Sequence, residues 1–101
     1  MSENKDWRDP IHPGEILADE LAEIGIGGAQ LADRLNIPNN RIYQILQGKR
    51  SITADTALRL GRFFGTGPKI WMALQNDYEL DVVQQEQSID LDKIVPYQTA
   101  A

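Results

Sequence analysis

The sequence predicts an all-α protein of five short helices with flexible segments at both ends. Apolar residues recur every three or four positions along most of the chain, the spacing that gives a helix one buried face. Clusters of turn-forming residues interrupt this pattern at residues 25–28, 36–39, 48–51 and 65–67. Outside residues 88–101, no segment is rich in strand-forming residues. A chain of 101 residues suits a single domain.

The first two helices follow an N-terminal arm of residues 1–11, which we expect to be flexible. Pro13 suits the first turn of a helix, so the first helix begins at His12 and Pro13. Its inward stripe is aliphatic: Ile16, Leu17, Leu21 and Ile24. Its outward face is acidic: Glu15, Asp19, Glu20 and Glu23. Glycines end it, and a second helix over residues 29–35 directs inward Leu31, Ala32 and Leu35.

A tight turn at residues 36–39 leads into the third helix, because Asn36 tolerates the left-handed conformation that a helix exit often needs. This helix spans about residues 39–47, and its inward side chains are Ile42, Ile45 and Leu46. After a loop, Thr53 can cap a fourth helix over residues 54–64. Asp55 and Arg59 lie four apart in that helix, in the order that favours an ion pair. Its expected core residues are Ala57, Leu58, Gly61 and Phe64.

The fifth helix begins at Pro68 and is longer than the others. The spacing along this helix puts on one face Trp71, Leu74 and Tyr78. The other four helices already supply a complete core without this face. We therefore expect these three residues to contribute to a homodimer. The domain is predicted to cover residues 12–87, followed by a C-terminal tail of residues 88–101. The alternation Ile89-Asp90-Leu91-Asp92 predicts a short strand in the tail.

Composition excludes several classes of protein. With no cysteine, the chain has no disulfide scaffold, thiolate metal site or cysteine nucleophile. No apolar run approaches about 18 residues, so no membrane span is expected, and the polar N-terminus predicts a cytoplasmic location. The single histidine, His12, is interpreted as a helix cap rather than a catalytic base. The carboxylates of the first helix have no nucleophile or second ligand set beside them, so no enzyme, metal or cofactor is predicted.

Charge is sorted along the chain. Residues 1–33 carry a net charge of −6 and residues 70–101 a net charge of −5. Between them lies the basic segment, residues 34–69, with seven Lys or Arg, one acid (Asp55) and a net charge of +6. A local basic face is the electrostatic signature of phosphate binding even in an acidic chain.

The second and third helices fit a helix-turn-helix, because each is too short to be stable alone. In that motif the second of the two helices lies in the major groove of double-stranded DNA. The outward residues of the third helix lack carboxylates and are predicted to read bases: Asn39, Asn40, Arg41, Tyr43, Gln44 and Gln47. Backbone amides at the start of the second helix and the loop after the third predict phosphate contacts at Gln30, Lys49, Arg50 and Ser51.

The chain resembles the HigA family of antitoxins, within the lambda-repressor-like (XRE) helix-turn-helix superfamily. The resemblance covers about residues 11–86 and is carried by IHPGEIL at 11–17, GKRSITADTALRL at 48–60, FGT at 64–66 and WMALQ at 71–75 with YEL at 78–80. It implies a five-helix, dimeric antitoxin that binds operator DNA and represses its own operon. It also implies a partner, a HigB-like toxin that is a RelE-type endonuclease of mRNA.

Two other functions fit the same residues. One is a transcriptional regulator that acts without a toxin, and the other is a protein-interaction module. DNA binding separates the module from the other two. A gene for a small basic endonuclease directly upstream separates the antitoxin from the stand-alone regulator.

Overall fold

The computed structural model describes residues 9–86 and 90–98, and within these ranges the fold is all-α, as predicted. It contains α1 (Pro13–Ile24), α2 (Gly28–Leu35), α3 (Asn39–Leu46), α4 (Ala54–Phe64), α5 (Lys69–Glu86) and a 3-10 helix, η1 (Leu91–Lys93). Most of the expected N-terminal arm, residues 1–8, lies outside the described residues, as do residues 87–89 and 99–101 of the expected tail.

Local sequence explains where the first helices begin and end. The Nδ1 atom of His12 accepts a hydrogen bond from the backbone N–H of Gly14 at 2.8 Å, so the predicted capping role of His12 is confirmed. Asn36 has φ 60° and ψ 47°, the left-handed conformation expected at the exit of α2. Between these points, Gly25 ends α1 in the same conformation.

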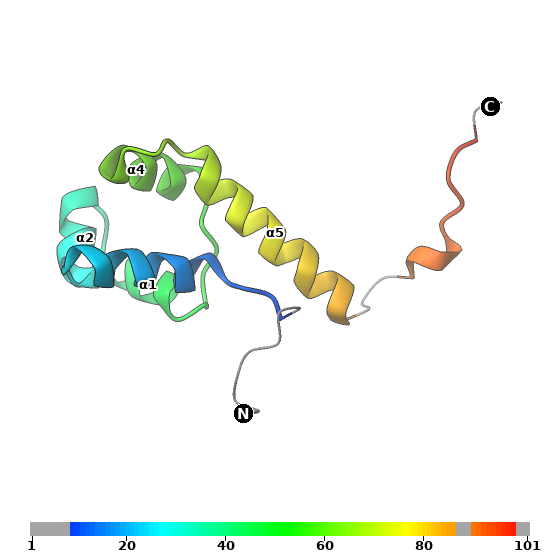
Figure 1. The fold of residues 1–101 in the computed structure, drawn as a ribbon, viewed down its shortest axis with the longest axis horizontal. Helices are drawn as coiled ribbons and strands as arrows, with labels where there is room; N and C mark the ends of the chain where they lie inside the picture. Colours follow the sequence, from blue (N-terminus) through cyan, green and yellow to red (C-terminus); the bar gives the residue numbers. More distant parts are fainter. Residues whose placement is uncertain (1–8, 87–89, 99–101) are drawn as a thin grey trace.

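The core lies among α1 to α4 and the start of α5. It is made of aliphatic side chains closed at one side by Trp71: Leu17, Leu21, Leu31, Ala32, Leu35, Ile37, Ile42, Ile45, Ile52, Ala57 and Leu60. α2 packs on α3 and α4, while α1 packs on α3 and α5. In Figure 1, α5 begins against α4 and extends away from the other four helices.

Gly14 allows α1 to lie directly against the end of α3. A Cβ atom at Gly14 would collide with the backbone carbonyl of Ile45. This close approach fixes the position of α3 relative to α1.

The inward face of α4 differs from the predicted one. Leu58 is 60% exposed, whereas Leu60 and Thr56 are buried. Leu58 and Leu60 are about 200° apart around a helix, so only one of them can face the core. The expected stripe of α1 is also shorter than predicted, because Ile24 at its last turn is 47% exposed.

The predicted strand in the tail is wrong. Leu91 and Asp92 belong to η1, where the N–H groups of Lys93 and Ile94 donate to the carbonyls of Asp90 and Leu91. Ile89 lies outside the described residues. A strand needs a partner for its backbone groups, and within the described residues no backbone hydrogen bond joins residues 90–98 to another element.

Candidate nucleic-acid interface

The α2–turn–α3 unit is held by backbone hydrogen bonds and close packing. The N–H of Ile37 donates to the carbonyl of Ala32 at 3.0 Å, which folds the turn back on α2. At the other end, a Cβ atom at Gly28 would lie 3.1 Å from the ring of Tyr43, so α2 and α3 cross with only a hydrogen between them there. α3 is thus fixed against both α1 and α2.

The outer face of α3 collects the six side chains that the sequence predicts as base readers. Ile42 and Ile45 are fully buried and point to the core. The opposite side of the helix consists of exposed polar residues with two half-buried neighbours: Asn39, Asn40, Tyr43 and Gln47, with Arg41 and Gln44. α3 contains no acidic residue, so this face offers hydrogen-bond donors and acceptors without repelling phosphate.

The loop after α3 carries the expected phosphate contacts Lys49, Arg50 and Ser51, all exposed. The N–H of Lys49 donates to the carbonyl of Gln44 at 2.8 Å, which keeps the loop close to the last turn of α3. Across this turn, Arg50 Nε donates to Gln44 Oε1 at 2.8 Å. The loop cations therefore lie beside the polar face of α3.

Two buried polar residues outside the predicted interface hold this loop, Gln75 and His12. Gln75 of α5 is 3% exposed, and its Oε1 atom accepts a hydrogen bond from the N–H of Ile52 at 2.8 Å. Its Nε2 atom donates to Glu79 at 3.0 Å. Gln75 thus ties the segment that follows Arg50 to α5.

His12 supports the same loop from the other side. Its ring lies edge-on against Tyr78, with ring centroids 4.8 Å apart, and a Cβ atom at Gly48 of the loop would lie 3.8 Å from the His12 ring. Burial lowers the pKa of His12, although the Arg50 backbone and the charge of Glu15 act in the opposite direction. The histidine is therefore neutral near pH 7, as its capping acceptor Nδ1 requires.

Arg41, one of the predicted base readers, is engaged within the protein. Its Nη1 atom lies 2.8 Å from Oδ2 of Asp55 at the start of α4. The same carboxylate oxygen accepts from Arg59 Nε at 3.1 Å, which confirms the predicted pairing of residues 55 and 59. Hydrogen bonds from Arg59 and Arg41 hold the pKa of Asp55 below its usual value. The sequence alone did not indicate the link to Arg41.

Gln30, the remaining predicted phosphate contact, is exposed in the first turn of α2. Its Oε1 atom accepts a hydrogen bond from the N–H of Gly27 at 3.0 Å. The side chain therefore caps the helix end at which we expected a phosphate, and its amide nitrogen is the group available to one.

The three residues expected at a dimer contact lie partly in the core of their own chain. Trp71 is only 3% exposed and lies beside Phe64, with ring centroids 5.8 Å apart. Leu74 and Tyr78 are half-buried, and Tyr78 contacts His12. The large apolar side chains that α4 and α5 leave exposed are Leu58, Ile70 and Leu80.

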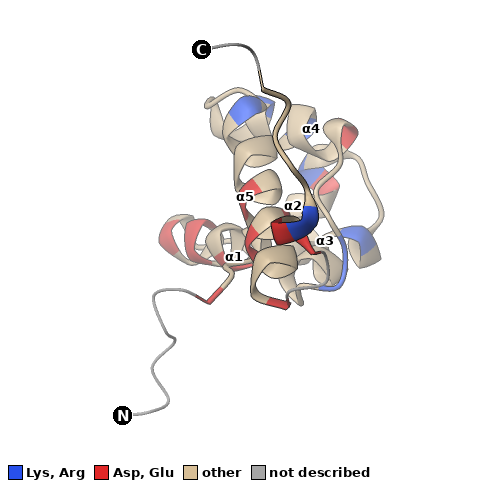
Figure 2. Ribbon diagram, turned by 90° about the vertical axis from the view of Figure 1, so that its right-hand side faces the viewer, with Lys and Arg blue, Asp and Glu red and all other residues tan. Residues whose placement is uncertain are grey.

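Acidic residues are most frequent on α1 and α5, and basic residues around α3 and α4. Figure 2 shows Asp and Glu on α1 and on α5, with Lys and Arg on the loop after α3 and around α4. In the described part of the chain, no three His, Cys, Asp or Glu side chains gather as metal ligands would. Among the same residues, no helix combines the length and apolar character needed to cross a membrane.

Known proteins are similar to this chain in sequence and in structure. Residues 19–71 match the helix-turn-helix family HTH_3. Virulence-associated protein I of Dichelobacter nodosus is 44% identical over 93 residues, which cover 90% of this chain and 84% of that protein.

Two solved structures superpose on most of the molecule. An addiction-module antidote protein of the HigA family from Coxiella burnetii is 49% identical, with a TM-score of 0.81 and coverage of 87% of this chain and 98% of that one. A Pseudomonas aeruginosa protein solved in complex with its operator DNA is 40% identical, with a TM-score of 0.84 and coverage of 89% and 97%.

Proposed function

We propose that this chain, which belongs to the HigA family of XRE-type helix-turn-helix proteins, is the antitoxin of a type II toxin–antitoxin pair. In this role it neutralises a HigB-type mRNA endonuclease, and it binds operator DNA to repress its own operon. The family consists of DNA-binding antitoxins and regulators, which agrees with the prediction that the chain is not an enzyme.

The observation that carries the DNA-binding role is the acid-free outer face of α3 with the loop cations beside it. In this proposal α3 enters the major groove. Asn and Gln amides suit adenine and Arg suits guanine, so the base contacts fall to Asn39, Asn40, Arg41, Tyr43, Gln44 and Gln47. Backbone phosphates are contacted by Gln30, Lys49, Arg50 and Ser51.

The acidic surface of α1 supports the toxin-binding role. Glu15, Asp19, Glu20 and Glu23 are all exposed on this helix. A protein that cleaves RNA needs a basic surface for its substrate. An acidic helix complements such a surface, so the antitoxin can bind the toxin through α1 while α3 stays free for DNA.

A homodimer suits this function because two copies of α3 can occupy two half-sites of a symmetric operator. A groove of about 420 Å³ between α4 and α5 supports this part of the proposal, since most of its lining is apolar, including Leu58, Pro68 and Met72. We therefore propose that the dimer contact includes Leu58 and the predicted face of α5, with the half-buried Leu74 and Tyr78 and the buried Trp71.

Co-expression tests the proposal most simply. The chain is co-expressed with the product of the gene directly upstream, which the proposal expects to be a small basic protein, and growth, complex formation and binding to the promoter of the two genes are measured. The proposal predicts rescue of growth, a stable complex and promoter binding. Promoter binding without a complex or rescue would identify a stand-alone regulator, and absence of DNA binding would leave only an interaction module.

A further inference from the structure

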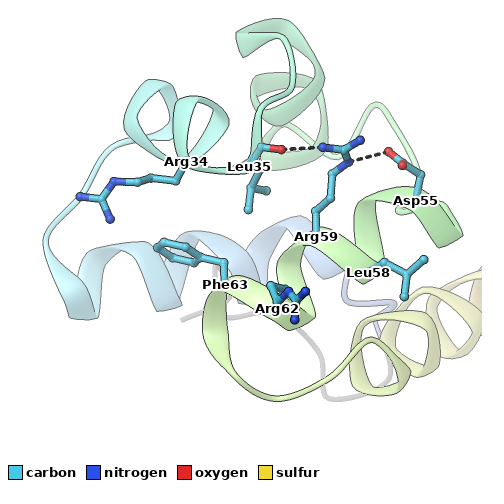
Figure 3. A pocket seen from close by; sticks show the side chains of 7 residues that line it. All are labelled: Arg34, Leu35, Asp55, Leu58, Arg59, Arg62 and Phe63. Carbon is cyan, nitrogen blue, oxygen red and sulfur yellow. Dashed lines mark hydrogen bonds and ion pairs between the residues drawn. The ribbon is translucent and has the colours of Figure 1, made fainter.

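Asp55 occupies an unusual position, as the only acidic residue of the basic segment. Its Oδ2 atom accepts hydrogen bonds from two guanidinium groups, from Arg41 Nη1 of α3 at 2.8 Å and from Arg59 Nε of α4 at 3.1 Å. Figure 3 shows Arg59 between Asp55 and the end of α2, where Arg59 Nη1 donates to the Leu35 carbonyl at 2.7 Å. One carboxylate thus binds a cation of α3 and a cation of α4.

We propose that Asp55 sets the sequence specificity of DNA binding by orienting Arg41 for base contact and withholding it from DNA phosphates. This inference rests on the proposed DNA-binding function. Asp55 itself does not reach the DNA in this account, and acts as a positioning residue through Arg41.

The reason lies in the two ways an arginine can bind DNA. A free guanidinium beside a duplex pairs with phosphates of any sequence, and each such contact adds affinity for random DNA and increases the salt dependence. A guanidinium held in one direction can form the paired hydrogen bonds that distinguish a base. The Arg41 side chain is 28% exposed and its bond to Asp55 fixes its direction, so it satisfies the second condition.

Arg59 makes it possible to separate this role from a structural one. The contact between Arg59 and the Leu35 carbonyl joins α4 to the end of α2 without Asp55. Removing the charge of Asp55 therefore releases Arg41 while that link between α2 and α4 remains. The side chain of Asp55 is 55% exposed, so its replacement leaves no buried cavity.

The experiment compares Asp55→Asn with the wild-type chain on its promoter DNA and on scrambled DNA of equal length, over a range of salt concentrations. Asp33→Asn is the matched control, because it removes one exposed acid from α2, the helix that packs on both α3 and α4. The proposal predicts that Asp55→Asn binds scrambled DNA several-fold more tightly, with a salt slope steeper by about 0.9 per bound chain. The promoter gains less, so the specificity ratio falls, whereas Asp33→Asn leaves the ratio close to that of wild type.

The double variant Arg41→Ala/Asp55→Asn tests the route through Arg41. Without Arg41, the substitution of Asp55 should no longer steepen the salt slope beyond the change seen for Asp33→Asn. Asp55→Ser is a second variant that releases Arg41, and it keeps a small polar residue in the first turn of α4. Its DNA affinities are measured in the same way, and its thermal unfolding is measured as well.

Three results would overturn the inference: an unchanged specificity ratio in both Asp55 variants, a slope gain that persists without Arg41, or an equal loss of affinity for both DNAs, which would assign Asp55 a structural role. Failure of the wild-type chain to prefer its promoter over scrambled DNA would instead contradict the proposed function.

Discussion

Arg50 Nε lies 2.8 Å from Gln44 Oε1, so the residue proposed to contact phosphate is hydrogen-bonded to the one proposed to read a base. The bond uses the carbonyl oxygen of the Gln44 amide and leaves its NH₂ group as a donor. It also holds the Arg50 side chain beside the last turn of α3. The free protein therefore presents the two side chains as a pre-arranged pair, which reduces the entropy lost when DNA binds.

The stability of the fold should depend on pH through His12. Its pKa is lowered from 6.5 mainly by burial, so the unfolded chain binds a proton more readily than the folded one. Stability is then greatest above pH 6.5 and decreases as the pH falls through the lowered pKa of the folded state. Thermal unfolding between pH 8 and pH 5 should show this fall. His12→Asn keeps a capping side chain without a titrating ring, and its curve should be flatter. Coincident curves for the two proteins would contradict this role.

Gln75 should matter more for stability than its polarity suggests. Gln75→Leu leaves the buried N–H of Ile52 without its acceptor, which costs about 1–3 kcal/mol. Gln84→Leu, at an exposed position of the same helix, is the control and should change the free energy of unfolding little. Denaturant unfolding measures both. Equal stability of the two variants would show that the loop does not depend on the Gln75 contact.

Leu58 should affect assembly rather than folding. Leu58→Glu places a charge in the groove between α4 and α5, where we propose that a second copy docks. Sedimentation should find this variant as a folded monomer and the wild-type chain as a dimer. Leu80→Glu, at a site with 62% exposure outside that groove, should remain dimeric. A Leu58→Glu dimer as stable as wild type would place the interface elsewhere.

The acidic face of α1 should contribute to binding of the toxin and not to binding of the operator DNA. Asp19→Lys with Glu23→Lys reverses two exposed charges of this face. Because complementary charge steers association, the double variant should bind the basic partner more slowly and more weakly, and growth rescue should weaken with it. Promoter affinity should not fall. A loss of promoter binding with intact toxin binding would reverse the assignment of the two surfaces.

The sequence was sufficient for the helices and the turn of the recognition unit because their signals are local. Pro13, Asn36 and the apolar spacing of Ile42 and Ile45 each act within a few residues. The face of α4 was predicted less well, since Leu58 and Leu60 are both apolar and only the packing of α2 and α5 on α4 selects Leu60.

Contacts between distant residues could not be predicted in this way. Gln75 binds Ile52 from 23 positions away, and polarity alone would assign such a glutamine to the surface. Asp55 was correctly paired with Arg59, four residues along its own helix, but its partner Arg41 lies 14 positions earlier on another helix. The composition of the basic segment predicted a DNA-binding surface without indicating which of its cations are already engaged within the protein.

The most direct test of DNA reading by α3 compares Gln44→Ala with Arg50→Ala on promoter and scrambled DNA at several salt concentrations. Gln44→Ala should cost about 1–3 kcal/mol on the promoter and little on scrambled DNA, because it removes a base contact. Arg50→Ala should weaken both complexes alike and reduce the salt slope by about one unit per half-site, because it removes a phosphate contact. Equal losses on both DNAs for Gln44→Ala would mean that α3 does not read the operator.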